Sequence, residues 1–128
     1  MADPSSHDFV SRLVSLYREE ILPSRTRRVR LLGRKCSPQI MRTFLGYELQ
    51  LNRMRVTCPD LPTARYLRIF GEIGLASVLI PYEPHRTAAL VPELEACFTE
   101  LKNASPDPQR LRDVFRSLRR RIVGVESF

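Results

Sequence analysis

The stretch from residue 54 to residue 80 restricts the fold of this chain more than any other part of it. It begins with the alternating segment MRVTC, continues with a helix-like run over 61–73, and ends in an apolar segment at 76–80. Asp60 offers a side-chain oxygen to the free N–H groups that begin the helix, and Gly74 is suited to end it. Two strands joined by one helix through short connections predict a right-handed crossover with both strands parallel in one sheet.

A β-hairpin is predicted immediately before this helix. Residues 45–51 alternate leucine and tyrosine with glycine, glutamate and glutamine, which is typical of a half-buried strand. Asn52-Arg53 then form a short turn, and residues 54–58 alternate again. The hairpin and the crossover together predict an α+β or α/β fold: a small three-stranded mixed sheet covered by about five helices.

The rest of the chain is predicted to be mainly helical, from the spacing of its apolar residues and from its start and stop signals. The additional helices are expected at 6–22, 37–45, 88–102 and 106–122, the second of them starting at Ser37-Pro38. The residues expected at the centre of the core are Leu67, Phe70, Ile73, Val78 and Ile80, together with Leu13, Leu94, Phe98 and Leu118.

The length of 128 residues suits one domain with a real core and is too short for two. We expect an α/β core at 37–104, with a basic segment at 24–35 and a basic C-terminal helix at 106–128 as appendages. No apolar run approaches the ~20 residues that cross a bilayer, and the N-terminus lacks the features of a signal peptide. A cytoplasmic location is therefore expected, with no transmembrane segment.

The positive charge is concentrated in two blocks of the chain. The net charge is +7, yet residues 24–57 alone carry +8. Dense arginine clusters bind phosphate backbones through counterion release, and the planar guanidinium fork fits a phosphate. The residues predicted to bind nucleic acid are Arg25, Arg27, Arg28, Arg30, Arg34 and Lys35 in the first block and Arg112, Arg116, Arg119 and Arg120 in the second.

A second candidate site comes from the predicted crossover. The loops after two parallel strands open on the same edge of a sheet, where ligands of open α/β sheets bind. This shared edge would gather Asp60, Tyr82, Glu83, His85 and Arg86 as a ligand site. Structural roles also explain these residues, since Asp60 is suited to cap a helix and Tyr82 to be a half-buried aromatic.

Catalysis is weakly supported by the sequence. Cys58, His85 and a nearby carboxylate would supply a thiol nucleophile and its base. Strand alternation, however, places Cys58 on the buried face with Met54 and Val56. The three cysteines are scattered without metal-site spacing, and no hydrolase, metalloprotease or phosphate-loop signature is present. We expect a non-enzymatic binding module without catalytic residues, metal or cofactor.

The segment CPDLPTARYLRIFGEIG, with LLGRK before it and IPYEP after it, resembles a small family of basic cyanobacterial proteins. The resemblance extends over roughly residues 24–102. It implies a cytoplasmic bacterial protein. It implies no activity and no site residue, because the shared positions are core and turn residues.

Three kinds of partner remain open. RNA or DNA, contacted through its backbone with little sequence specificity, is the first. The second is an acidic protein or another copy of the chain, because the acidic N-terminal helix and the acidic residues at 93–100 could pair with the arginines. The third is a membrane surface, contacted by the basic amphipathic C-terminal helix.

Overall fold

The computed structural model describes residues 6–127. The helical elements are α1 (Ser6–Leu16), the π-helical turn η1 (Tyr17–Ile21), α2 (Leu61–Ile73), α3 (Pro84–Asn103) and α4 (Pro108–Glu126). The strands are β1 (Thr26–Arg30), β2 (Gln39–Thr43), β3 (Gly46–Leu51), β4 (Met54–Cys58) and β5 (Ser77–Pro81).

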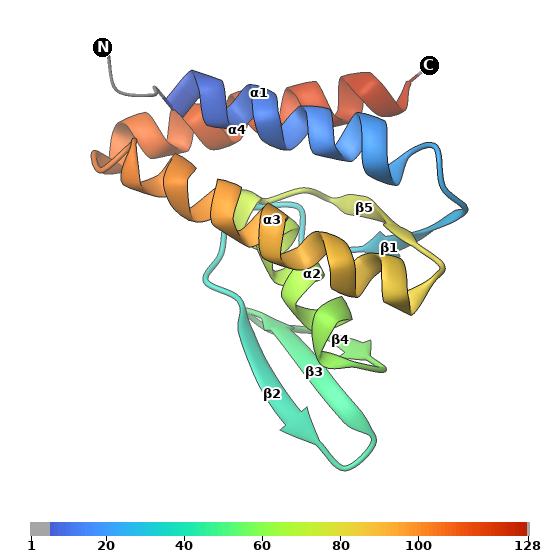
Figure 1. The fold of residues 1–128 in the computed structure, drawn as a ribbon. Helices are drawn as coiled ribbons and strands as arrows, with labels where there is room; N and C mark the ends of the chain where they lie inside the picture. Colours follow the sequence, from blue (N-terminus) through green and yellow to red (C-terminus); the bar gives the residue numbers. More distant parts are fainter. Residues whose placement is uncertain (1–5, 128) are drawn as a thin grey trace.

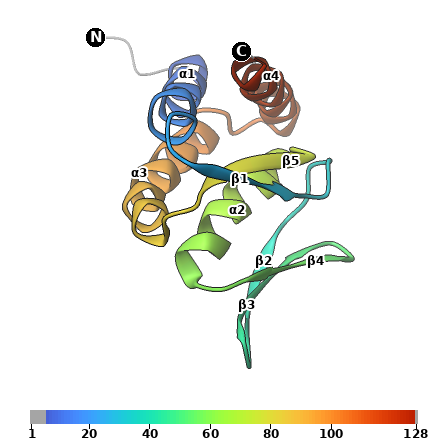
Figure 2. The ribbon, with the colours of Figure 1, turned by 90° about the vertical axis from the view of Figure 1, so that its right-hand side faces the viewer.

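The elements are arranged in layers around α2. Helices α1 and α4 lie side by side above the two-stranded sheet β1–β5, and α2 lies below that sheet (Figure 1, Figure 2). The three-stranded sheet β2–β3–β4 packs on the far side of α2. Helix α3 runs along the flank of α1 and α2. The hydrophobic core fills the space between these layers.

The predicted hairpin is confirmed, and the predicted crossover is wrong. Residues 46–51 and 54–58 pair as the antiparallel strands β3 and β4. β5 is not a parallel neighbour of β4. It pairs antiparallel with β1 in a separate sheet, with Val29 opposite Val78. The segment TRRVR concealed β1, because Val29 is its only apolar residue and four charged or polar residues surround it.

The third strand of the larger sheet occupies a segment that we predicted to be helical. Ser37-Pro38 has the form of a helix start, but the edge strand β2 follows it, with Ile40 opposite Leu49. A proline at the start of an edge strand is tolerated because it removes no ladder hydrogen bond. Residues 6–127 therefore form an α+β fold with four α-helices and two small antiparallel sheets, not one mixed sheet under about five helices.

Helix α2 forms where its start and stop signals predicted it. The Asp60 side chain accepts a hydrogen bond from the Thr63 N–H at 2.8 Å, which satisfies one of the free donors of the first turn. Gly74 ends the helix with a φ of +99°, and its N–H bonds back to the carbonyls of Phe70 and Gly71. Asp60 therefore has a structural role.

The core prediction is confirmed: all nine residues predicted for the core are buried, and even Phe98 is only 5% exposed. The same cluster includes Val29 and Leu31 from the first basic segment. It also includes Phe115, Leu118 and Ile122, the apolar stripe of α4. Residues 24–35 and 106–128, which we expected to be appendages, thus supply side chains to the core.

Two tyrosines fix β5 between the helical layers. The Tyr17 hydroxyl donates to the Glu126 carboxylate and accepts the Leu79 N–H at 3.0 Å. The Tyr66 hydroxyl donates to the carbonyl of the same residue, Leu79, at 2.6 Å. Burial, together with the bond to Glu126, raises the pKa of Tyr17 far above its usual range, so the hydroxyl remains a donor. This network ties the end of α4 to the sheet.

Candidate polyanion-binding site

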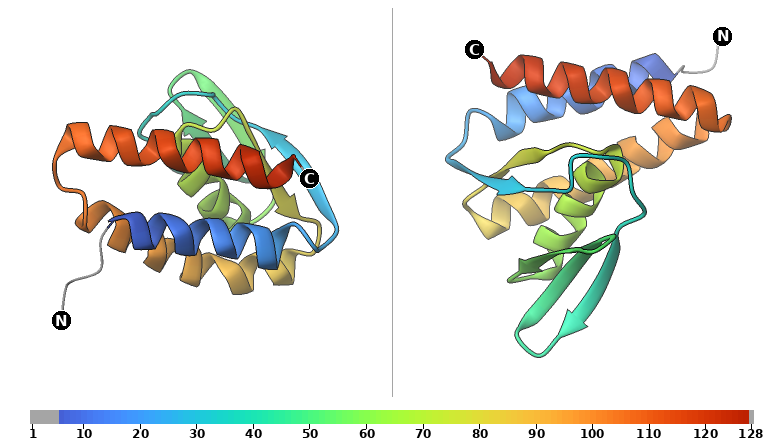
Figure 3. Two further views of the ribbon diagram at one scale, coloured as in Figure 1. Left: turned by 90° about the horizontal axis from the view of Figure 1, so that it is seen from above. Right: turned by 180° about the vertical axis from the view of Figure 1, so that it is seen from behind.

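The two basic blocks meet beneath α4. The loop at 31–37 passes under this helix (Figure 3), and a depression of about 250 Å³ lies between them. The lining residues are Gly33, Arg34, Lys35, Arg112, Phe115, Arg116 and Arg119. We call this depression the basic site. Five of its seven lining residues are cationic and none is acidic, so it is suited to a negatively charged ligand.

Helical spacing brings three of these arginines together. Arg112, Arg116 and Arg119 lie at positions i, i+4 and i+7 of α4, which share one face of the helix. Phe115 lies between them and is fully buried, so it anchors that face to the core. The Lys35 ammonium lies 5.6 Å from the centre of the Phe115 ring, which places the loop cation over the apolar floor.

Backbone contacts hold the loop against the end of α2. The Leu31 N–H donates to the Ala76 carbonyl at 2.8 Å, and the Gly33 N–H donates to the Leu75 carbonyl at 3.1 Å. Arg119 donates to the Ile73 carbonyl at 2.7 Å, one of the free carbonyls at the C-terminus of α2. The basic site is therefore built on hydrogen-bonded backbone and a packed helix.

The charges of the site are unbalanced. Burial, and next the neighbouring Arg116, lower the pKa of Arg119. Within residues 6–127, Arg34, Arg112 and Arg116 make no hydrogen bond, ion pair or cation–π contact through their side chains. A bound anion would offset the repulsion between these cations, because a negative charge at short range attracts each guanidinium and ammonium group.

Gly74→Ala is expected to displace the loop that carries Arg34 and Lys35. A Cβ at this position would lie 2.7 Å from the backbone nitrogen of Lys35 and 2.9 Å from the carbonyl carbon of Arg34. The backbone at Gly74 also has a φ of +99°, which strains any residue with a side chain. Strain and overpacking together should lower the free energy of unfolding by about 2 kcal/mol or more in urea titrations. Gly124→Ala is the control, because nothing lies within 4 Å of its Cβ. An unchanged urea midpoint for Gly74→Ala would contradict this packing.

Half of the ten predicted nucleic-acid-binding residues line the basic site, and the others lie outside its lining. Arg28 is bound to the Ser77 hydroxyl at 2.8 Å and to Glu126 at 3.2 Å, so it serves the fold. The Arg25 guanidinium lies 4.7 Å from the centre of the Tyr82 ring. The remaining three are Arg27, Arg30 and Arg120. Phe115 was not among the predicted site residues, although it lies three positions from Arg112 and therefore on the same side of α4.

The premise of the shared-edge ligand site is wrong, because β4 and β5 belong to different sheets. Arg86 donates to the Glu20 carbonyl at 2.6 Å and pairs with the Glu20 carboxylate at 3.6 Å. Glu83 and His85 are exposed at the start of α3. Among the described residues, no hydrogen bond or ion pair joins Asp60 to any of the other four predicted residues. These residues do not form one hydrogen-bonded constellation.

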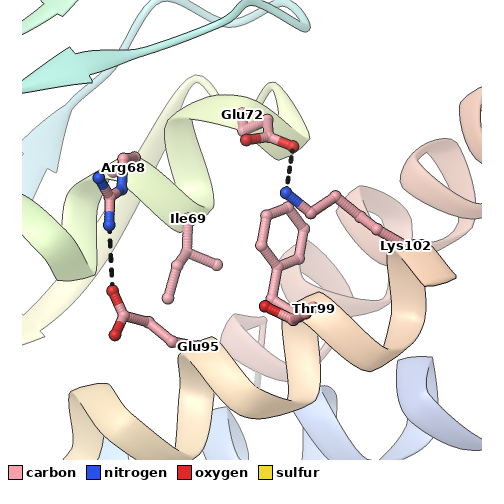
Figure 4. Close-up of a pocket in the computed structure, with 7 residues that line it drawn as sticks. Arg68, Ile69, Glu72, Glu95, Thr99 and Lys102 are labelled. Atoms are coloured by element: carbon pink, nitrogen blue, oxygen red, sulfur yellow. Dashed lines mark hydrogen bonds and ion pairs between the residues drawn. The ribbon is translucent and has the colours of Figure 1, made fainter.

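A larger depression, of about 450 Å³, lies between α2 and α3, but its charges are already paired (Figure 4). Arg68 and Glu95 lie 3.2 Å apart, and Lys102 and Glu72 are separated by the same distance. Arg65 also binds Glu95, and this bond is the main cause of the lowered pKa of Glu95. These pairs bridge the two helices, so this depression offers a ligand less unpaired charge than the basic site.

Cys58 is not suited to act as a nucleophile. Its side chain is fully buried, as predicted, and burial, reinforced by the Asp60 charge, raises its pKa to about 11. We expect iodoacetamide at about pH 8 to alkylate Cys58 about a hundredfold more slowly in the folded protein than in urea, because the thiolate is scarce and covered. Peptide mapping would measure both rates. Equal rates would reopen the enzyme hypothesis.

Residues 6–127 contain neither a metal-binding cluster nor a membrane-spanning helix. No group of three His, Cys, Asp or Glu side chains in this part of the chain is placed to hold a metal ion. No helix in it is both long and apolar enough to cross a membrane. Comparisons with protein-family models, curated proteins and solved structures find no match to this chain. The function is therefore inferred from the geometry of the chain itself.

Proposed function

We propose that this protein binds the backbone of RNA or DNA through the basic site, with little sequence preference. One observation carries the proposal: five cations from two segments far apart in the chain line one depression that contains no carboxylate. Phosphate contacts of this kind position a nucleic acid without reading its bases.

A polymer fits these charges better than a single small anion. Outside the basic site, three more arginines are exposed and have no carboxylate partner within residues 6–127: Arg30, Arg42 and Arg120. A chain of phosphates can engage such spaced cations together, whereas one phosphate reaches only a few. The binding energy would then come mainly from counterion release.

The alternative of a protein-interaction module has less support. It supposed that the acidic helices pair with the basic blocks, but most of their acidic groups have other partners in the chain. Glu93 pairs with Arg12, and Glu95 pairs with Arg65 and Arg68. Of the ten predicted basic residues, only Arg28 has a carboxylate partner within residues 6–127.

The membrane alternative required the apolar stripe of α4 to be free. The stripe residues Phe115, Leu118 and Ile122 are fully buried in the core. A membrane could reach the apolar face of α4 only if the helix left the core. The basic flank of α4 remains exposed, so this helix offers charge to a partner but little apolar surface.

The proposal is tested by measuring the affinity of the purified protein for mixed-sequence RNA and DNA at two salt concentrations. We expect clear binding at about 50 mM salt and roughly a hundredfold loss at about 200 mM, the change produced by about four phosphate contacts. Scrambled sequences of equal length should bind alike. Absence of binding at about 50 mM salt would reject the proposal. A larger mass of the protein in solution, from self-association or from addition of an acidic protein, would favour the protein-interaction alternative.

A further inference from the structure

Two large apolar side chains are exposed at the tip of the β2–β3 hairpin. Phe44 and Leu45 form the turn, with exposed fractions of 104% and 87%. Met41 on β2 is also exposed. These three are half of the six large apolar residues exposed in the described part of the chain, and they lie within five positions. The hairpin itself projects away from the helices (Figure 1).

The turn does not require apolar residues at these two positions. Two-residue hairpin turns favour Asn, Gly and Asp, and the other hairpin has Asn52 there with a φ of +57°. At the tip, the positive φ of +136° falls on Gly46, where a Cβ would lie 2.9 Å from the Cys58 carbonyl oxygen. Folding therefore explains Gly46 and leaves Phe44-Leu45 unexplained. Exposed apolar groups that folding does not use often mark a binding surface.

The β2–β3 hairpin carries two charged residues, Arg42 and Glu48, and Glu48 pairs with Arg55 at 3.6 Å, which leaves the charge of Arg42 unbalanced. Arg42 is exposed and has no ion-pair partner within residues 6–127. The loop that carries Lys35 continues directly into β2 and the hairpin (Figure 3). Nine residues of chain lead from Lys35 to Phe44 and span at most about 30 Å when fully extended, the length of about nine base steps in a duplex. One nucleic-acid strand held at the basic site can therefore reach the tip.

We propose that the hairpin tip contacts bases of the nucleic acid whose backbone occupies the basic site, with the Phe44 ring stacking on an unstacked base and Leu45 packing beside it. The inference rests on the proposed function. Aromatic rings stack on bases of any sequence, and apolar side chains can act as wedges between base steps. The tip would add contacts that do not depend on salt.

Charge complementarity favours this occupant over a second copy of the chain. A second copy would bring a sheet of the same net charge, because residues 39–58 carry a net charge of +2. Like charges repel, and Arg42 beside the tip would increase that repulsion. A polyanion places phosphates next to Arg42 and offers apolar base faces to Phe44. It therefore satisfies both the charge and the apolar surface of the tip.

The test replaces Phe44 and Leu45 by serine and measures binding to a single-stranded oligonucleotide that contains the fluorescent base 2-aminopurine. A length of about 16 nucleotides is within the footprint of proteins that bind single-stranded nucleic acid. We expect affinity about tenfold weaker, with an unchanged salt dependence because no phosphate contact is lost. The fluorescence change of 2-aminopurine should disappear. Phe44→Tyr should preserve it, and Val123→Ser, an exposed apolar residue on α4, is the matched control.

The outcomes separate this inference from the proposed function. If the tip variant binds and changes the fluorescence as wild type does, while Arg112→Gln with Arg116→Gln weakens binding, the inference is overturned and the basic site stands. If wild type does not bind the oligonucleotide, both fail. Loss of binding to vesicles of phosphatidylserine and phosphatidylcholine, with oligonucleotide affinity intact, would assign the tip to a membrane. A lower oligomeric mass of the tip variant, with that affinity intact, would assign it to self-association.

Discussion

Phe70→Ala is expected to lower the free energy of unfolding by about 3 to 5 kcal/mol, a large part of the stability of a domain of this size. Phe70 is fully buried on α2, the helix between the two sheets. Its ring centre lies 4.9 Å from that of Tyr66 and 5.8 Å from that of Tyr17. Truncation would leave a cavity beside both tyrosines, whose hydroxyls hold β5 at Leu79.

The measurement is the urea midpoint at constant m-value, and Phe44→Ala is its matched control. Both variants lose the same atoms, but Phe44 is exposed, so its truncation should change the free energy of unfolding by no more than about 0.5 kcal/mol. A near-neutral effect of Phe70→Ala would show that α2 presents a different face to the core. A large effect of Phe44→Ala would show that the hairpin tip packs on something within the protein.

Local signals predicted α2 and the β3–β4 hairpin because these elements are specified by neighbouring residues. The Asp60 cap and the positive φ at Gly74 act within one turn of the helix. The hairpin alternates over 46–58, and its turn at Asn52 has the positive φ that such turns use. Elements of this kind need no information from distant parts of the chain.

Strand pairing could not be predicted in the same way. β5 was assigned to the nearest predicted strand, β4, but it pairs with β1, about fifty positions earlier in the chain. A short connection predicts a parallel crossover only when both strands belong to one sheet. Val29 is the only apolar residue of β1, so the strand has no alternating apolar pattern. Its Arg28 instead binds Ser77 and Glu126. The arginines that identified the basic block at 24–35 therefore also removed the apolar pattern that would have predicted β1.

The candidate site was predicted by composition but not in its geometry. Charge clustering indicated ten residues, whereas the path of the loop at 31–37 decides which of them meet α4. That path depends on backbone bonds to Leu75 and Ala76, which no local pattern reveals. The exposed pair Phe44-Leu45 was missed because the segment was assigned to a helix. The remaining signal was Gly46, because a glycine before an alternating segment can adopt the positive φ that a tight turn requires.

Replacing Arg34, Arg112 and Arg116 by glutamine is expected to remove most of the affinity for nucleic acid. These three are chosen because their side chains have no partner within residues 6–127, so their loss should leave the fold intact. Three lost phosphate contacts should reduce the slope of log affinity against log salt by about 0.9 each. At about 50 mM salt, the affinity should fall by a factor on the order of a thousand.

The control replaces Arg12, Arg18 and Arg86 by glutamine, which removes the same net charge. Each of these arginines is exposed and paired with a glutamate: Glu93, Glu19 and Glu20, respectively. Circular dichroism would establish that both variants fold. The control should lose little affinity and keep the wild-type salt slope, because distant charges are screened within roughly 10 to 15 Å at these salt concentrations. Equal losses in both variants would show that total charge, and not the basic site, governs binding, whereas an unchanged slope in the site variant would exclude Arg34, Arg112 and Arg116 from contact with phosphate.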